Sequence, residues 1–127
     1  MSSLWDLVED SVAEARELMR LARYRGAVSR AYYAVYSAAR ALLVEHAGFE
    51  EGDVRRHAAV HKLFSEHLVR PGLMPSDLGA GLRRLSTKRA DADYQGTPVE
   101  KEQAQETLAF MERFLEAATR VRKSPPP

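Results

Sequence analysis

The sequence contains no cysteine, almost no net charge and no long uninterrupted apolar run. The absence of cysteine excludes disulfides and thiolate chemistry, and it fits a reducing compartment. A formal net charge of +1 excludes a global attraction to nucleic acid or to a membrane, so any such attraction must be local. The N-terminal stretch is acidic and lacks the apolar run of a signal peptide or membrane anchor. We therefore expect a cytoplasmic protein that does not associate with membranes.

The chain has the length and composition of one domain. With 127 residues, of which 45% are hydrophobic, it can build one continuous core. Neither an internal repeat nor a linker divides it. The sequence therefore predicts a single helical domain over residues 1–123, followed by a flexible, proline-rich tail over residues 124–127.

Apolar residues recur at helical spacing along the whole chain, and no segment alternates as a strand would. The expected helices are a first one from Ser2 or Ser3 to Arg23, a second over Ala27–His46, a shorter third one starting at or just after Asp53, a fourth from Ser76 or Asp77 to the Gln95–Pro98 stop, and a last one over Pro98–Arg122. The expected connections are Tyr24–Gly26, Gly48–Asp53 and Arg70–Pro75. Because these loops are short, we predict an all-α, up-and-down antiparallel bundle of four long helices and one short helix.

The second expected helix has three distinct faces. One row is bulky and should fill the core, and it comprises Val28, Tyr32, Val35, Ala39 and Leu42. A second row is made of alanines, at positions 27, 31, 34, 38 and 41, and would let another helix or a second subunit approach closely. The third row, with Arg30, Tyr33 and Arg40, could bind phosphate and stack a base, or form an ordinary amphipathic surface.

The stretch Leu82–Gly96 places an arginine on an apolar row. Leu82 and Leu85 lead along one helix face to Arg89, and Asp93 follows four residues later, at the spacing where two helical side chains meet. A stranded charge on such a row costs several kcal/mol, so Arg89 needs a partner. The pattern is that of a structural Arg–Asp pair or of a polar site at the lip of the bundle, with Tyr94 next to it.

His57 and His61 stand at i and i+4, which is the spacing of metal ligands on a helix. The residues between them are apolar, and no third ligand lies close by in the sequence. A histidine near a helix start and a second one at the core edge explain the pair better than a metal site does. We therefore predict no metal site and no cofactor.

Three segments together resemble a HEPN domain. The first is SRAYYAVYSAARALL (Ser29–Leu43), and the second is HAAVHKLF (His57–Phe64). The third is RADADY (Arg89–Tyr94), with the leucine and arginine before it. The resemblance extends from about Leu4 to Arg120. It is closest to the small stand-alone prokaryotic branch whose fourth helix ends in an R-x-x-A-D-Y-type motif. It implies an up-and-down helical bundle that forms a two-fold dimer.

The resemblance also implies an activity. Many HEPN proteins are metal-independent ribonucleases, often toxins encoded beside a minimal nucleotidyltransferase antitoxin. Their catalytic arginine is followed after four to six residues by a histidine, and two copies converge at the dimer cleft. Arg89 matches the arginine, but Tyr94 stands where the histidine would be, with Asp93 before it. Because a tyrosine has a pKa of about 10 against about 6.5 for histidine, it exchanges protons poorly near neutrality.

Three functions therefore stay open. The first is a nucleotide- or RNA-binding module that works with a nucleotidyltransferase. That enzyme could add AMP to Tyr94. The second is a ribonuclease toxin with Arg89, Asp93 and Tyr94 in a cleft of a homodimer. The third is a structural dimerisation module. For binding, the candidate residues are Arg30, Tyr33, Arg40, Arg84, Lys88 and Arg89. Together with Arg83 they would form one basic patch if the second and fourth helices are adjacent.

Overall fold

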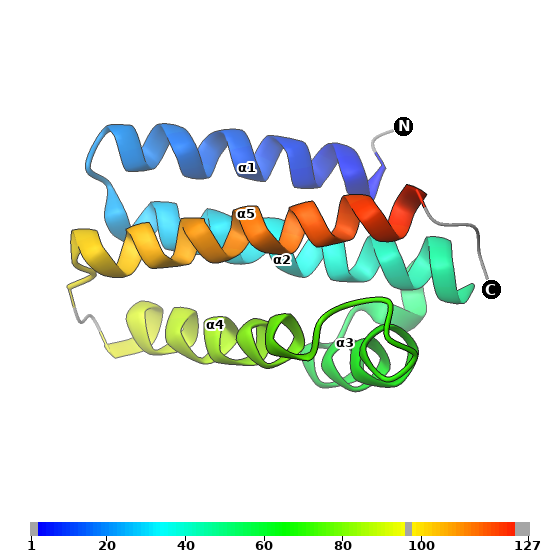
Figure 1. The fold of residues 1–127 in the computed structure, drawn as a ribbon. Helices are drawn as coiled ribbons and strands as arrows, with labels where there is room; N and C mark the ends of the chain where they lie inside the picture. The colour runs from blue at the N-terminus through cyan, green and yellow to red at the C-terminus, as the bar shows by residue number, and fades with distance from the viewer. Residues whose placement is uncertain (1–2, 96–97, 124–127) are drawn as a thin grey trace.

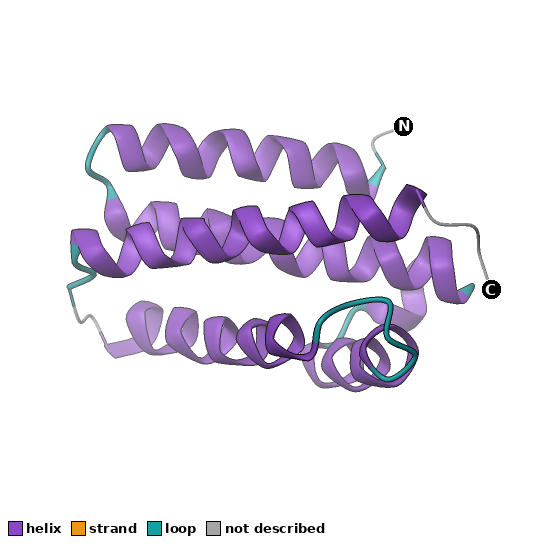
Figure 2. Cartoon of the chain, in the orientation of Figure 1, coloured by secondary structure: helices purple, strands orange, loops and turns teal. Residues whose placement is uncertain are grey.

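The computed structural model describes residues 3–95 and 98–123, with the backbone alone for residues 89–95. The α-helices are α1 (Leu4–Arg20), α2 (Tyr24–Ala47), α3 (His57–Phe64), α4 (Ser76–Gln95) and α5 (Lys101–Lys123). A 3₁₀ turn, η1 (Glu51–Val54), precedes α3, and a π-helical segment, η2 (Ser65–Val69), extends it. The described residues contain no strand (Figure 2), so the all-α prediction is confirmed. The predicted tail, residues 124–127, lies outside the described residues.

The long helices lie side by side as a bundle (Figure 1). Helices α1 and α4 run in one direction, and α2 and α5 run in the other. The short α3 lies across the end of the bundle where α2 finishes and α4 begins. Helix α2 contacts α1, α3, α4 and α5. The expected four long helices and one short helix are therefore present, with α2 as the central element.

Two predicted boundaries were wrong, each for a local reason. The segment Tyr24–Gly26 belongs to α2, and the connection is the tighter turn before it. Gly26 serves close packing, because a Cβ there would stand 3.1 Å from the Leu18 side chain of α1. Helix α5 begins at Lys101 and not at Pro98. The side chain of Gln103, expected on the buried stripe, instead accepts a hydrogen bond from the backbone N–H of Glu100 at 2.9 Å.

The core is built around the two apolar rows of α2. The bulky row is buried as predicted, and so is the alanine row, at positions 27, 31, 34, 38 and 41. Small side chains let neighbouring helices approach closely, and here those neighbours are helices of the same chain. The alanine row therefore no longer argues for contact with a second subunit.

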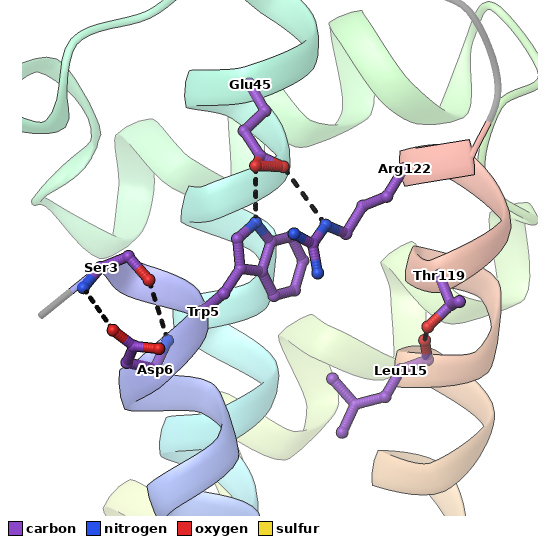
Figure 3. A network of polar contacts seen from close by, with 7 residues as sticks. All are labelled: Ser3, Trp5, Asp6, Glu45, Leu115, Thr119 and Arg122. Carbon is purple, nitrogen blue, oxygen red and sulfur yellow. Dashed lines mark hydrogen bonds and ion pairs between the residues drawn. The ribbon is translucent and has the colours of Figure 1, made fainter.

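A polar contact joins three helices near the two termini (Figure 3). The indole N–H of Trp5 in α1 donates to Glu45 Oε2 in α2 at 2.8 Å. Arg122 Nε of α5 lies 3.4 Å from Glu45 Oε1, and its guanidinium carbon lies 4.0 Å from the centroid of the Trp5 ring. Both side chains of this ion pair are partly exposed, so the pair contributes little by itself. Its stacking on Trp5 fixes how α5 ends against α1.

The turn between α1 and α2 contains an alanine in a strained backbone conformation. Relieving this strain should stabilise the protein. Ala22 has a φ of 58°, a left-handed conformation that costs a residue with a Cβ roughly 1–2 kcal/mol. Ala22→Gly should therefore raise the free energy of unfolding by about 0.5–1 kcal/mol, after the greater entropy of glycine in the unfolded chain is deducted. Urea denaturation measures the change. Ala22→Val should lower stability, and a glycine variant no more stable than the parent would contradict the interpretation.

Candidate functional site

A chain of hydrogen bonds ties α2, α3 and α4 together. Tyr32 of α2 is 2% exposed, yet its hydroxyl lies 2.6 Å from Nδ1 of His57 in α3. Ser86 of α4 donates its hydroxyl to the same Tyr32 oxygen at 3.3 Å. A buried tyrosine hydroxyl needs such partners, because an unsatisfied one costs about 1–3 kcal/mol. The contact therefore brings residues far apart in the sequence to one point of the surface.

Aromatic stacking orients the His57 ring further. The ring centroids of Tyr36 and His57 are 4.4 Å apart with an interplanar angle of 17°. The Tyr36 hydroxyl donates to the carbonyl of Arg55 at 2.7 Å. Burial, with a smaller contribution from the nearby Tyr32, raises the pKa of Tyr36, so its hydroxyl keeps the proton that it donates. Stacking and hydrogen bonding together fix the start of α3 on α2.

Two adjoining hollows open between α3 and α4. The first has a volume of about 450 Å³ and is polar, lined by His57, Ala58, His61, Arg83, Ser86 and Thr87. The second has a volume of about 300 Å³ and is mainly apolar, lined by His61, Phe64, Ser65, Val69, Ser76, Gly79, Ala80, Leu82 and Arg83. His61 and Arg83 line both, so they stand between the two. None of the described residues that line either hollow carries a carboxylate.

His61 is held in its neutral form. Burial lowers the pKa of its imidazole, and the positive charges of Arg83 and His57 lower it further. Its Nδ1 atom is buried and has no hydrogen-bond partner among the described residues. Near neutral pH the lasting positive charge of the two hollows therefore comes from Arg83 and not from this histidine.

The predicted basic row of α2 does not form one continuous surface. Arg30 lies 3.9 Å from Glu14 of α1 and 5.7 Å from the centroid of the Tyr33 ring. Tyr33 is 38% exposed, whereas Ser37, the next residue of the row, is buried. Arg40 donates through Nε to the carbonyl of Val54 in η1 at 2.6 Å. Arg30 and Tyr33 thus stay together near α1, and Arg40 fastens η1 to α2.

Two of the predicted basic residues of α4, Arg84 and Lys88, lie on the side of this helix that faces α5. Arg84 and Lys88 line a third hollow of about 200 Å³, together with Phe110 of α5. This hollow exists because Gly81 lets α5 come close, since a Cβ at Gly81 would stand only 2.2 Å from the Phe110 ring. Glu106 and Arg113 of α5 also line it. The structure therefore places Arg84 and Lys88 beside α5, and Arg83 beside α3.

The side chains of Arg89, Asp93 and Tyr94 lie outside the described residues. Their backbone belongs to α4, which continues to Gln95. Position 89 follows Ser86 by three residues, so it stands one helical turn further along the same face. The structure thus relates the predicted motif to the polar hollow through the helix that carries both.

Sequence reasoning named Arg83 only as part of a general basic patch, and it missed three other residues of the polar site. Tyr32 was assigned to the core, which is correct for its ring but overlooks its hydroxyl. Arg83, Ser86 and Thr87 share a helix face at i, i+3 and i+4, and this spacing was a usable signal. His57 and His61 were considered as metal ligands, or as a helix-start histidine and a core-edge histidine, but not as part of a polar site. Among residues 3–88 and 98–123 there is no group of three or more His, Asp or Glu residues placed to hold a metal ion.

In the part of the chain that the structure describes, no helix could span a membrane. None of those helices combines the length and the apolar character that crossing a bilayer requires.

Comparison with known proteins gives one family and several relatives. A model of the HEPN domain matches residues 1–121. The protein named "Putative toxin MJ0605" of Methanocaldococcus jannaschii is 28% identical over 91% of this chain and 84% of its own length. The protein named "UPF0332 protein glr0978" of Gloeobacter violaceus is 31% identical over 91% of this chain and 90% of its own length. A second M. jannaschii protein, "Putative toxin MJ0142", is 27% identical over 91% of this chain and 76% of its own length.

The Tyr32 hydroxyl should matter far more than that of its neighbour. Tyr32→Phe removes the partner of both His57 and Ser86 and should lower the free energy of unfolding by about 1–2 kcal/mol. Tyr33→Phe is the matched control, because Tyr33 is exposed and no described residue bonds to its hydroxyl, so stability should stay unchanged. Urea denaturation compares the two. Equal effects of the two substitutions would show that the hydrogen bonds to Tyr32 contribute nothing.

The lowered pKa of His61 predicts a specific pH dependence of stability. The unfolded chain binds a proton at this histidine near pH 6.5, whereas the folded chain binds it only at lower pH. Stability should therefore be constant above about pH 6.5 and fall as the pH drops below this value. Denaturation midpoints between about pH 5 and 8 test this, with His61→Gln as the comparison. A slope equally steep in His61→Gln would assign the effect to other groups.

Proposed function

Because the chain belongs to the HEPN domain family, we propose that it is a toxin-like HEPN module that binds nucleotide or RNA and works with a minimal nucleotidyltransferase. Two relatives that cover most of its length carry the name putative toxin. The pairing with a nucleotidyltransferase and the homodimer come from the resemblance to the toxin branch, and the proposed cytoplasmic location comes from the absence of cysteine and the acidic N-terminal stretch. In this proposal the partner enzyme transfers AMP from ATP to the Tyr94 hydroxyl, with pyrophosphate as the leaving group, and thereby places negative charge and bulk beside Arg89.

The observation that carries the binding function is a set of three α4 cations that pair with no acidic side chain among the described residues. Five arginines elsewhere are ion-paired with carboxylates, namely Arg16, Arg20, Arg30, Arg113 and Arg122. Of the described carboxylates, none forms an ion pair with Arg83, Arg84 or Lys88. Cations left without acidic partners attract an external anion, and the phosphates of RNA are such anions. The three residues also lead along α4 towards Arg89, the arginine of the family motif.

A ribonuclease activity is the second candidate, and one observation favours it. The family motif lacks its histidine here, but His57 is held at 2.6 Å by Tyr32, next to Ser86 of α4. Position 89 is one turn beyond Ser86, so an imidazole from α3 stands close to the helix that carries Arg89. In this reading Arg89 stabilises phosphate charge, with Asp93 and Tyr94 beside it in a dimer cleft. A purely structural module is less well supported, because the alanine row is buried within one chain.

RNA binding should depend on α4 and not on arginine in general. We expect Arg84→Ala and Lys88→Ala each to weaken binding of single-stranded RNA and to reduce the slope of log K against log salt by about 0.7. Arg89→Ala should weaken it most. Arg16→Ala is the matched control, because this exposed arginine of α1 is paired with Glu112. Fluorescence anisotropy at several salt concentrations measures all four variants.

Two further readings accompany that titration. A melting curve for each variant separates lost binding from lost folding, which matters most for Arg89→Ala. Incubating the same RNA with metal-free protein tests cleavage, and cleavage that disappears in Arg89→Ala supports the ribonuclease. Equal losses of affinity in all variants, Arg16→Ala included, would show a general charge effect and contradict the proposal.

A further inference from the structure

The two hollows between α3 and α4 have complementary chemistry. The polar one offers the guanidinium of Arg83, the imidazole of His57 and the hydroxyls of Ser86 and Thr87. The apolar one is walled by Phe64, Val69, Ala80 and Leu82. Their volumes, about 450 and 300 Å³, are of the size that small-molecule sites have. Because they share His61 and Arg83, a single ligand can occupy both.

The polar hollow is suited to an anion and not to a cation. Arg83 supplies a permanent positive charge, and no described carboxylate is paired with it. The two hydroxyls stand three and four residues after Arg83, on the same face of α4. A guanidinium is a common protein partner of a phosphate group. The Ser86 hydroxyl donates to Tyr32 and the Thr87 hydroxyl donates to the carbonyl of Arg83, so each must turn away from that partner to donate to a ligand. A metal ion would find no carboxylate ligand among the described residues that line this hollow.

The apolar hollow is suited to a flat, weakly polar group. The π-helical segment η2 widens the backbone at this place, with the N–H of Arg70 donating to the carbonyl of Ser65, five residues earlier, at 2.9 Å. Ser65 and Val69 of that segment line the hollow, and Gly79 and Ala80 of α4 leave room opposite them. His61 lies between this space and the polar hollow, with its neutral ring available to stack on an aromatic group.

We propose that the α3–α4 hollows form a nucleotide site, in which Arg83 binds the phosphate, Ser86 and Thr87 turn their hydroxyls towards it, and the apolar hollow holds the base. This inference rests on the proposed binding function but assigns it a place, because Arg84 and Lys88 line a different hollow beside α5. The ligand is a nucleoside monophosphate, supplied either as a free molecule or as the phosphorylated end of an RNA strand. Arg83 is its main anchor.

Isothermal titration calorimetry of the full chain tests the site with adenosine monophosphate, inorganic phosphate and adenosine. The nucleotide should bind at least about tenfold more tightly than either part, because only the nucleotide fills both hollows. Arg83→Ala should weaken it by roughly ten- to a hundredfold, the effect of losing a charged hydrogen-bonding partner. Thr87→Val, which keeps the side-chain shape, should weaken it by a smaller factor. Lys62→Ala removes a charge from α3 outside the hollows and should leave the affinity unchanged.

The same proteins separate this site from the general binding function. If Arg84→Ala weakens binding while Arg83→Ala does not, the α3–α4 site is refuted and the proposed function stands. If neither the nucleotide nor single-stranded RNA binds the parent protein, both are refuted. Equal affinities for the nucleotide and inorganic phosphate would refute the base pocket. Tighter binding of a 5′-phosphorylated oligonucleotide than of the monophosphate would identify an RNA end as the source, and the reverse order would identify the free nucleotide. A circular dichroism spectrum of each variant confirms that it is folded.

Discussion

The burial of two faces of α2 is the constraint on which the rest of the structure depends. Most of this helix is inaccessible to water, and the other four helices pack around it. Alanines at five positions allow the close approach, while a bulky row fills the space between the helices. A helix so placed cannot leave its polar atoms in solvent. The hydroxyls of Tyr32 and Tyr36 must therefore find partners on whichever segments cover them.

Those partners determine where the candidate site lies. Tyr36 bonds to the backbone of Arg55, and Tyr32 bonds to His57 and Ser86. The buried hydroxyls thus fix the start of α3 against the middle of α4, and the polar and apolar hollows open between these two helices. The site is in this sense a consequence of packing. Two tyrosines that stabilise the core also decide which side chains of α3 and α4 face each other.

The sequence was sufficient for the helices and for their buried rows, because helical periodicity is a local signal that each segment carries by itself. Sequence reasoning failed for residues whose role depends on a contact that helical periodicity does not show. Gly26 was predicted as a turn residue, but its missing side chain makes room for Leu18. Gln103 was assigned to the core, but it caps a backbone N–H. His57 lies 29 residues before Ser86 in the chain, so no spacing rule could place the two around one hydroxyl. Arg83, Ser86 and Thr87 could have been grouped, since they share one face of α4.

The distribution of charge explains how a chain with a net charge of +1 can still bind an anion. On α1 and α5 the arginines are neutralised locally, as in the pairs Arg16–Glu112 and Arg122–Glu45. Ion pairs at such exposed positions add little stability, but they cancel the field that would otherwise spread over this side of the bundle. On α4, no described carboxylate forms an ion pair with Arg83. The charge of Arg83 is therefore not cancelled by any described carboxylate, and it lies beside hollows that have the right size for a ligand. The pairing of other arginines, such as Arg16 and Arg122, lowers the competition for an anion, and the hollows beside Arg83 supply the shape on which selectivity depends.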